Sequence, residues 1–87
     1  MDLLRDGPLT APATLILAHG AGAPMDSEWM NAIASGIAAN GIRVLRFEFP
    51  YMADRRTSGK RRPPDREAVL LDTWRRAFAE AGAERTF

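Results

Sequence analysis

The residues with the clearest chemical potential form one corner of the sequence, His19-Gly20-Ala21-Gly22-Ala23. His19 is the only histidine in the chain, and four small residues follow it whose backbone N–H groups no bulky side chain shields. This glycine corner supports three interpretations. Its N–H groups stabilise an oxyanion, they cradle a phosphate group, or the segment is a tight turn in which glycine serves backbone geometry alone.

The phosphate interpretation rests on Gly20 and Gly22, which supply the first half of a G-x-G-x-x-G pattern. Glu48 lies near the end of a predicted strand, where an acidic residue would bind a ribose hydroxyl. Met25 replaces the third glycine of the pattern, and Pro24 interrupts the turn. The pattern is therefore incomplete, and a dinucleotide-binding βαβ unit is the lesser alternative.

A second group of reactive side chains lies in residues 54–66, DRRTSGKRRPPDR, which we call the basic segment. Its basic residues are Arg55, Arg56, Lys60, Arg61, Arg62 and Arg66. Guanidinium groups bind carboxylates and phosphates through paired hydrogen bonds. The segment therefore predicts contacts to an anionic substrate, or a non-enzymatic module that binds anions or nucleic acid. The alternative is a solvated loop whose arginines pair with Glu48, Asp54 and neighbouring carboxylates.

Single residues around these motifs have both a structural and a functional interpretation. To act as a base, His19 would need a nucleophile and an orienting partner within hydrogen-bond reach. The alternative is a structural role, in which His19 holds the loop through a hydrogen bond. Arg46 and Glu48 alternate with aromatic residues, and we expect them to form a structural ion pair. Tyr51 follows them and is a candidate residue for the mouth of the pocket.

The elements that must position these groups follow from apolar spacing and turn residues. Residues 14–18 and 42–49 are apolar, partly β-branched runs typical of buried strands. A helical stripe begins after Asp26 or Ser27 as N-cap and ends at Asn40-Gly41. A second stripe begins after Asp65 as N-cap and ends at Gly82. Its apolar face comprises Ala68, Leu71, Trp74, Phe78 and Ala81, with Leu70 and Ala77 beside them.

The order strand, helix, strand, helix predicts a parallel α/β sheet. Residues 1–13 are expected to be a lead-in, residues 51–64 a polar loop, and residues 84–87 the start of a third strand. Two parallel strands cannot cover their own faces and edges. We therefore expect residues 14–87 to form a β-α-β-α piece of an incomplete three-layer sheet, and residues 1–87 to be the N-terminal part of one domain. An exposed sheet edge would favour self-association.

Composition narrows the class of protein. Hydrophobic residues make up 46% and charged residues 26% of the 87 residues, as in globular domains. The absence of cysteine and the single histidine argue against a disulfide and a metal site. A net charge of +1 argues against nucleic acid or a membrane as partner. No apolar run approaches the roughly 20 residues that span a bilayer, and the first residues lack the pattern of a secretory signal, so the cytoplasm is expected.

Three motifs together resemble a known family: HGAGA at residues 19–23, RFEFPY at residues 46–51, and the basic stretch of residues 55–64. The sequence from Thr14 onward resembles bacterial α/β-hydrolases of unassigned substrate that are sometimes labelled dienelactone-hydrolase-like. These are similar to the hydrolase-like domain of the testis-expressed and non-specific-lethal-complex proteins of animals. The resemblance implies the α/β-hydrolase sheet, with residues 14–19 as its third strand and residues 42–49 as its fourth.

The resemblance also implies a serine acyl hydrolase that acts on ester, thioester or amide-like carbonyls of a small molecule without a cofactor. The Gly-x-Ser-x-Gly elbow of that family would follow the second helix. Ser27, Ser35 and Ser58 lack glycines at this spacing, so no residue of the catalytic triad carries over. We expect this truncated hydrolase to be inactive alone. The resemblance carries over one feature of the active site, the oxyanion loop formed by the backbone of Gly20, Ala21 and Gly22. It also implies a structural role for His19, because the triad histidine of the family lies near the far C-terminus.

Overall fold

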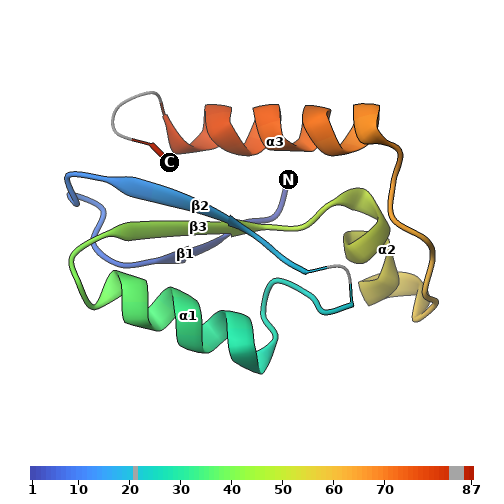
Figure 1. Cartoon of the computed structure of the whole chain (residues 1–87), viewed down its shortest axis with the longest axis horizontal. Coiled ribbons are helices and arrows are strands. Elements are labelled where there is room, and N and C mark those ends of the chain that lie inside the picture. Colours follow the sequence, from blue (N-terminus) through green and yellow to red (C-terminus); the bar gives the residue numbers. More distant parts are fainter. Residues whose placement is uncertain (21, 83–85) are drawn as a thin grey trace.

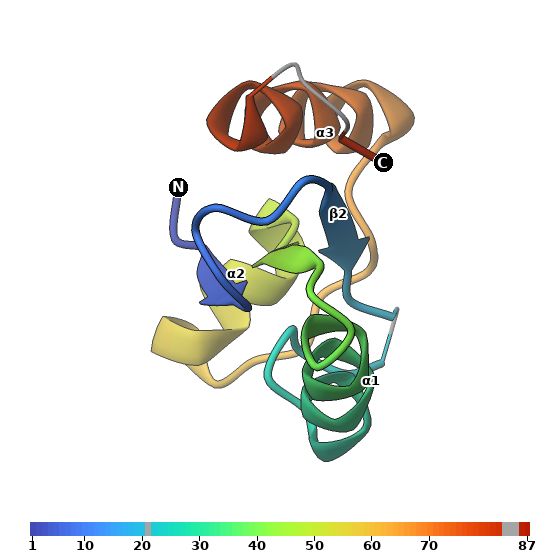
Figure 2. The ribbon, with the colours of Figure 1, turned by 90° about the vertical axis from the view of Figure 1, so that its left-hand side faces the viewer.

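The computed structural model describes residues 1–20, 22–82 and 86–87. The strands in these residues are β1 (Leu4–Asp6), β2 (Thr14–Ala18) and β3 (Arg43–Phe47). The helices are α1 (Glu28–Ala38), α2 (Pro50–Ser58) and α3 (Glu67–Ala81). Figure 1 shows the sheet between α1 and α3, with α2 beyond one end of the strands. The turned view in Figure 2 places α1 and α3 on opposite sides of the strands.

The sheet is mixed and has the strand order β1-β3-β2. Strands β2 and β3 run parallel, with Thr14 opposite Arg43. Strand β1 runs antiparallel to β3, with Leu4 opposite Arg46. The predicted wholly parallel sheet with a lead-in at residues 1–13 is therefore wrong at this edge. A three-residue edge strand is too short to show an apolar alternation, so the sequence pattern does not reveal it.

The last residues lie along the other edge of β2. The N–H of Phe87 donates to the carbonyl of Thr14 over 2.8 Å, and the N–H of Ile16 donates to the carbonyl of Phe87 over 2.6 Å. Thr86 pairs in parallel with Thr14. The predicted start of a third strand is thus observed at Thr86 and Phe87, whereas residues 84 and 85 lie outside the described part of the chain.

Helix α1 follows its predicted signals. Ser27 is the N-cap, and its hydroxyl oxygen accepts the N–H of Met30 over 3.2 Å. Met30 and Ala34 are buried on the face toward the sheet. The chain leaves the helix through Gly41, whose φ of +79° favours glycine. Local spacing and capping chemistry were sufficient to predict this helix.

Helix α2 lies where a polar loop was predicted. Pro50 occupies its first turn, where the missing N–H costs nothing. The carboxylate of Asp65 accepts the N–H of Tyr51 over 2.8 Å, so Asp65 caps α2 rather than α3. The predicted role of Asp65 as N-cap of the second predicted helix is therefore wrong, and that position belongs to Arg66. Asp65 follows α2 in the sequence, but the chain folds back between α2 and α3. This fold brings the Asp65 carboxylate to the first turn of α2.

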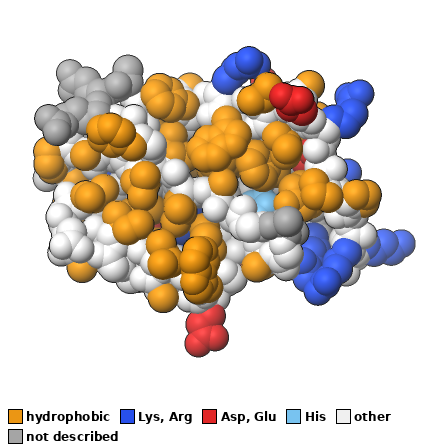
Figure 3. All heavy atoms as spheres, in the orientation of Figure 1, with side chains coloured by type: hydrophobic (Ala, Val, Ile, Leu, Met, Phe, Trp, Pro, Cys, Tyr) orange, Lys and Arg blue, Asp and Glu red, His pale blue; other side chains and the backbone are white. Residues whose placement is uncertain are grey.

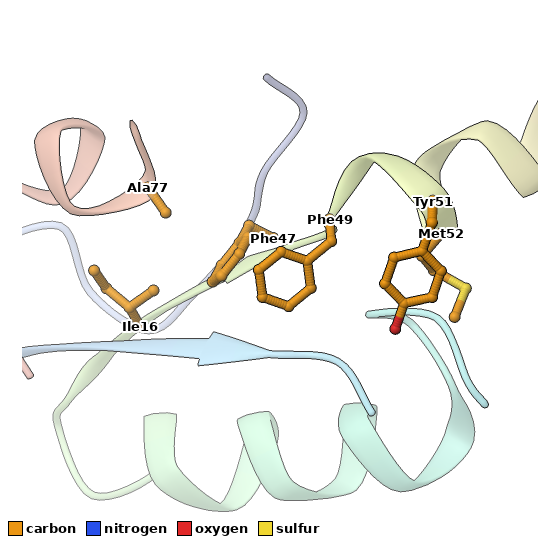
Figure 4. Packing of buried hydrophobic residues seen from close by; sticks show 6 residues of the cluster. All are labelled: Ile16, Phe47, Phe49, Tyr51, Met52 and Ala77. Carbon is orange, nitrogen blue, oxygen red and sulfur yellow. The ribbon is translucent and has the colours of Figure 1, made fainter. Parts of the chain in front are cut away.

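Helix α3 packs on the sheet through a face that only partly matches the predicted one. Thr73 and Ala77 are buried, whereas Leu71 and Phe78 are 45% and 47% exposed. The buried cluster consists of Ile16, Phe47, Phe49, Tyr51, Met52 and Ala77, and Figure 4 shows Tyr51 and Met52 at its α2 end. Apolar residues extend around more of α3 than the narrow sheet covers, so part of the predicted face stays exposed.

Alanine at Gly7 is expected to destabilise the fold more than alanine at Gly41. Both positions have positive φ, +84° and +79°. A Cβ atom at Gly7 would lie 2.5 Å from the carbonyl oxygen of Ile42, whereas no atom lies within 4 Å at Gly41. Positive φ alone costs about 1 kcal/mol, and the clash should raise the cost of Gly7→Ala to about 2–3 kcal/mol. Urea unfolding of both variants measures the difference, and equal losses would contradict the role of the Ile42 contact.

Candidate functional site

His19 joins the carboxyl ends of β2 and β3. Its side chain is 7% exposed and packs against the rings of Phe49 and Tyr51, at centroid distances of 5.3 and 5.5 Å. Its Nε2 accepts the N–H of Phe49 over 3.2 Å, and its Nδ1 lies 2.6 Å from the carbonyl oxygen of Gly20. These partners assign a neutral ring with the proton on Nδ1. Both nitrogens are therefore engaged with the backbone, and neither is free to serve a nucleophile.

The glycine corner has open space in front of it. A Cβ atom added at Gly20 or Gly22 would meet no atom within 4 Å. Gly20 also lacks a positive φ, so backbone geometry does not require glycine there. Ala21, the third member of the predicted oxyanion loop, lies outside the described residues. What the two glycines provide is an uncovered backbone at the carboxyl end of β2.

Arg46 and Glu48 hold the segment that leads from the glycine corner to α1. The guanidinium Nη1 of Arg46 donates to the carbonyl of Met25 over 3.0 Å, and the N–H of Met25 donates to Glu48 over 3.0 Å. The expected ion pair between Arg46 and Glu48 is wrong, because Arg46 pairs with Asp6 on β1 at 3.0 Å. The backbone of Met25 therefore links the two side chains, because its carbonyl accepts from Arg46 and its N–H donates to Glu48.

Glu48 forms an ion pair with Arg56 of α2. The Nε and Nη2 atoms of Arg56 each donate to one carboxylate oxygen of Glu48, both over 2.6 Å. Arg56 also pairs with Asp26 at 2.7 Å. Arg56, a predicted anion contact, is therefore occupied by two carboxylates of the chain itself. The Glu48 side chain is 4% exposed, whereas that of Arg56 is 40% exposed.

These pairs keep both carboxyl groups ionised. Burial raises the pKa of Glu48, but the hydrogen bonds from Arg56 and from the N–H of Met25 outweigh it, so the pKa lies below its usual value. The hydrogen bond from Arg56 lowers the pKa of Asp26. The same two carboxylates raise the pKa of Arg56 further above neutrality. The network is therefore fully charged at neutral pH.

One small hollow brings together several of the predicted site residues. It measures about 70 Å³ and is lined by Gly22, Tyr51, Met52, Arg55, Arg61 and Arg62. We call it the Gly22–Tyr51 hollow. Lys60 and Arg56, which were predicted beside the others, do not line it. Figure 3 shows a group of Lys and Arg side chains at the end of the molecule beside the pale blue His19.

The basic residues of the hollow differ in their partners. Arg62 lies 3.4 Å from Asp54 and 3.7 Å from Asp65. Among the described residues, Arg55 donates to the sulfur of Met52 at 4.0 Å and forms no ion pair, and Arg61 forms no ion pair either. The alternative expectation, in which the arginines pair with Glu48, Asp54 and neighbouring carboxylates, therefore describes Arg56 and Arg62. It does not describe Arg55 or Arg61 among the described residues.

Sequence reasoning missed Asp6 and Asp26 as partners of the inner charges. The only signal for them was indirect, because Arg46 on a buried strand must find a counter-charge somewhere in the chain.

Residues 1–20, 22–82 and 86–87 contain no group of three or more acidic or histidine residues that could hold a metal ion. None of the helices within these residues is long and apolar enough to cross a membrane.

The fold and the site together define an α/β domain whose candidate site lies at the carboxyl ends of two parallel strands, the usual place for ligands in such sheets. The sequence model of one family, described as the alpha/beta hydrolase domain, matches residues 11–87. The chain therefore belongs to the α/β-hydrolase domain family. No curated protein and no solved structure matches the chain in the corresponding comparisons.

Proposed function

We propose that this chain forms the oxyanion side of the active site of an acyl hydrolase that cleaves ester, thioester or amide-like carbonyls. The observation that carries the proposal is the uncovered backbone of Gly20 and Gly22 at the carboxyl end of β2. Both glycines are exposed, and no described atom beyond their chain neighbours lies within 4 Å of a Cβ atom added at either one. In our proposal, a substrate carbonyl oxygen therefore approaches the loop from this side. Membership of the α/β-hydrolase family supports the same reading.

The contacts on either side of the loop support this role. Oxyanion donors work best when they are already in place, because they then need no reorganisation during the reaction. His19 holds the start of the loop through the carbonyl of Gly20. Arg46 and Glu48 hold the residues that follow it through both backbone groups of Met25. In our proposal these three side chains are positioning residues, and the backbone between them donates to the oxyanion.

The nucleophile in this proposal is a serine outside residues 1–87, since none of Ser27, Ser35 and Ser58 has the elbow spacing. That serine attacks the carbonyl carbon, and the carbonyl oxygen takes up the negative charge that the loop N–H groups stabilise. Within the family, we place the chain in the dienelactone-hydrolase-like bacterial branch. Support for that placement comes from three motifs, at residues 19–23, 46–51 and 55–64.

Hydrolysis of p-nitrophenyl acetate tests the proposal. We expect no release of p-nitrophenol by the 87-residue chain alone. We expect the coding sequence beyond Phe87 to show Gly-x-Ser-x-Gly within about ten residues, one long strand. The longer polypeptide should hydrolyse the ester, and alanine at that serine should abolish turnover. A longer polypeptide without the motif and without activity would refute the hydrolase proposal.

Valine at Gly22 is expected to reduce this activity without weakening the fold. The new side chain enters the open space in front of the loop and narrows the Gly22–Tyr51 hollow. We expect kcat/KM of the longer polypeptide to fall about 100-fold, the size of losing one oxyanion contact. We expect the free energy of unfolding to change by less than about 1 kcal/mol.

Gly36→Ala is the matched control for this variant. Gly36 also faces open space, but it lies on α1 away from the hollow. Alanine there should leave kcat/KM unchanged and stabilise the helix by about 0.5–1 kcal/mol. An unchanged kcat/KM in Gly22→Val would show that the hollow does not receive the substrate.

A further inference from the structure

We propose that the substrate of this site carries a carboxylate or phosphate group, which Arg55 and Arg61 bind at the Gly22–Tyr51 hollow. The inference rests on the hydrolase function proposed above and names the substrate class for it. The ligand is a small acidic acyl compound. Its charged group lies beside the loop that receives its carbonyl.

The first argument for an anionic ligand is the excess of positive charge at the hollow. Both carboxylates of the basic segment, Asp54 and Asp65, pair with Arg62. This leaves Arg55 and Arg61 as the two guanidinium groups at the hollow without a carboxylate partner in the described residues. Guanidinium groups bind carboxylates and phosphates with matched, paired donors. The hollow therefore presents two positive charges that the described chain does not neutralise.

The second argument for such a ligand is the volume of the hollow. One water molecule occupies about 30 Å³ of liquid volume, and the hollow measures about 70 Å³. It therefore accommodates a single group of carboxylate or phosphate size. A neighbouring hollow of about 170 Å³ is lined by Pro24, Met52, Arg55 and Arg56 and shares two of these residues with the first. The second hollow has room for the rest of a small molecule.

Tyr51 is a neutral residue among those that line the hollow. Its ring is buried at the α2 end of the core cluster, and its residue lines the hollow (Figure 4). Burial and the negative charge of Asp65 raise the pKa of the Tyr51 hydroxyl, so it keeps its proton at neutral pH. A protonated hydroxyl can donate to an anionic oxygen. The residues that line the hollow thus include two guanidinium groups and a protonated tyrosine.

Titration of the chain with inorganic phosphate and with acetate, followed by amide NMR at constant ionic strength, tests the site. We expect saturable shifts at Gly22, Tyr51 and Arg55, and the tighter of the two anions identifies the charged group. The double variant Arg55→Gln/Arg61→Gln should weaken binding by at least about ten-fold. Arg75→Gln, an exposed arginine on α3, should change it by less than about two-fold.

Several results would overturn the anion site. Shifts that never saturate, or an equal loss in Arg75→Gln, would show non-specific attraction. Tighter, strongly salt-dependent binding of a short single-stranded RNA would assign the basic segment to nucleic acid instead. Because phosphate binding needs no turnover, saturable binding would support the anion site even where the hydrolase test fails.

Turnover of paired esters tests the substrate class separately. We expect the longer polypeptide to prefer the p-nitrophenyl monoester of glutaric acid, which keeps a free carboxylate, over p-nitrophenyl butyrate. The preference should fall toward unity in Arg55→Gln/Arg61→Gln. Equal rates for both esters in the unaltered polypeptide would overturn the acidic substrate while leaving the hydrolase proposal in place.

Discussion

Methionine at Arg46 is expected to destabilise the fold by about 3–5 kcal/mol, the usual cost of removing one partner from a buried ion pair. Arg46 is 7% exposed, and its guanidinium group donates to both carboxylate oxygens of Asp6, at 3.0 and 3.2 Å. It also donates to Asn31 over 2.6 Å and to the carbonyl of Met25 over 3.0 Å. The variant leaves all these acceptors without their donor, and methionine supplies none.

Urea unfolding followed by circular dichroism measures this loss. Arg5→Met is the matched control, because Arg5 is exposed on β1 and neighbours the same strand pair. Its replacement should change the free energy of unfolding by less than about 0.5 kcal/mol. Losses of similar size in the two variants would show that the network around Arg46 contributes little to stability.

Glutamine at Arg56 is expected to cost about 2 kcal/mol at pH 7, less than a fully buried pair because the guanidinium is partly solvated. Among the described residues, the variant leaves the carboxylate of Glu48, 4% exposed, with the N–H of Met25 as its remaining donor. It also removes the partner of Asp26. The fold is therefore destabilised mainly because the buried carboxylate of Glu48, next to the glycine corner, loses its ion pair.

The cost of Arg56→Gln should depend on pH. In the folded chain the pKa values of Glu48 and Asp26 lie below their usual values. Their contribution to stability is therefore complete above about pH 5 and is lost as pH falls through the lowered values. Without Arg56, the burial that raises the pKa of Glu48 prevails, and the folded variant takes up a proton more readily. The difference between variant and unaltered chain should thus shrink on acidification.

Unfolding free energies at pH 7, 5 and 3.5, all read from urea curves, check this dependence. Arg61→Gln is the control, since Arg61 lies in the same basic segment but has no ion pair with the described residues. It should change stability by less than about 0.5 kcal/mol at each pH. A cost of Arg56→Gln that stays constant from pH 7 to pH 3.5 would contradict the charged network.

The candidate site was predictable where it follows one stretch of chain. The glycine corner, Tyr51 and the basic segment were all identified by residue type, and the structure places Gly22, Tyr51 and Arg55 around one hollow. Which arginines stay unpaired was not predictable. Arg55 and Arg56 are neighbours of the same type, yet only Arg56 reaches the carboxylates of Asp26 and Glu48. Their direction on α2 decides this, and the sequence pattern predicts a polar loop where α2 lies.

The sequence by itself determined β2, α1, the core of β3 and the family of the chain. The three elements depend on apolar spacing, a cap such as Ser27, or a glycine such as Gly41, all within a few residues. The family was indicated by the resemblance of the motifs at residues 19–23, 46–51 and 55–64, and the family model that matches residues 11–87 shows it. Only the tertiary structure decided that Asp6 meets Arg46 and that Asp65 caps α2. Those partners lie 40 and 14 residues apart in the chain. Their pairing depends on the path of the backbone between them, which no local pattern records.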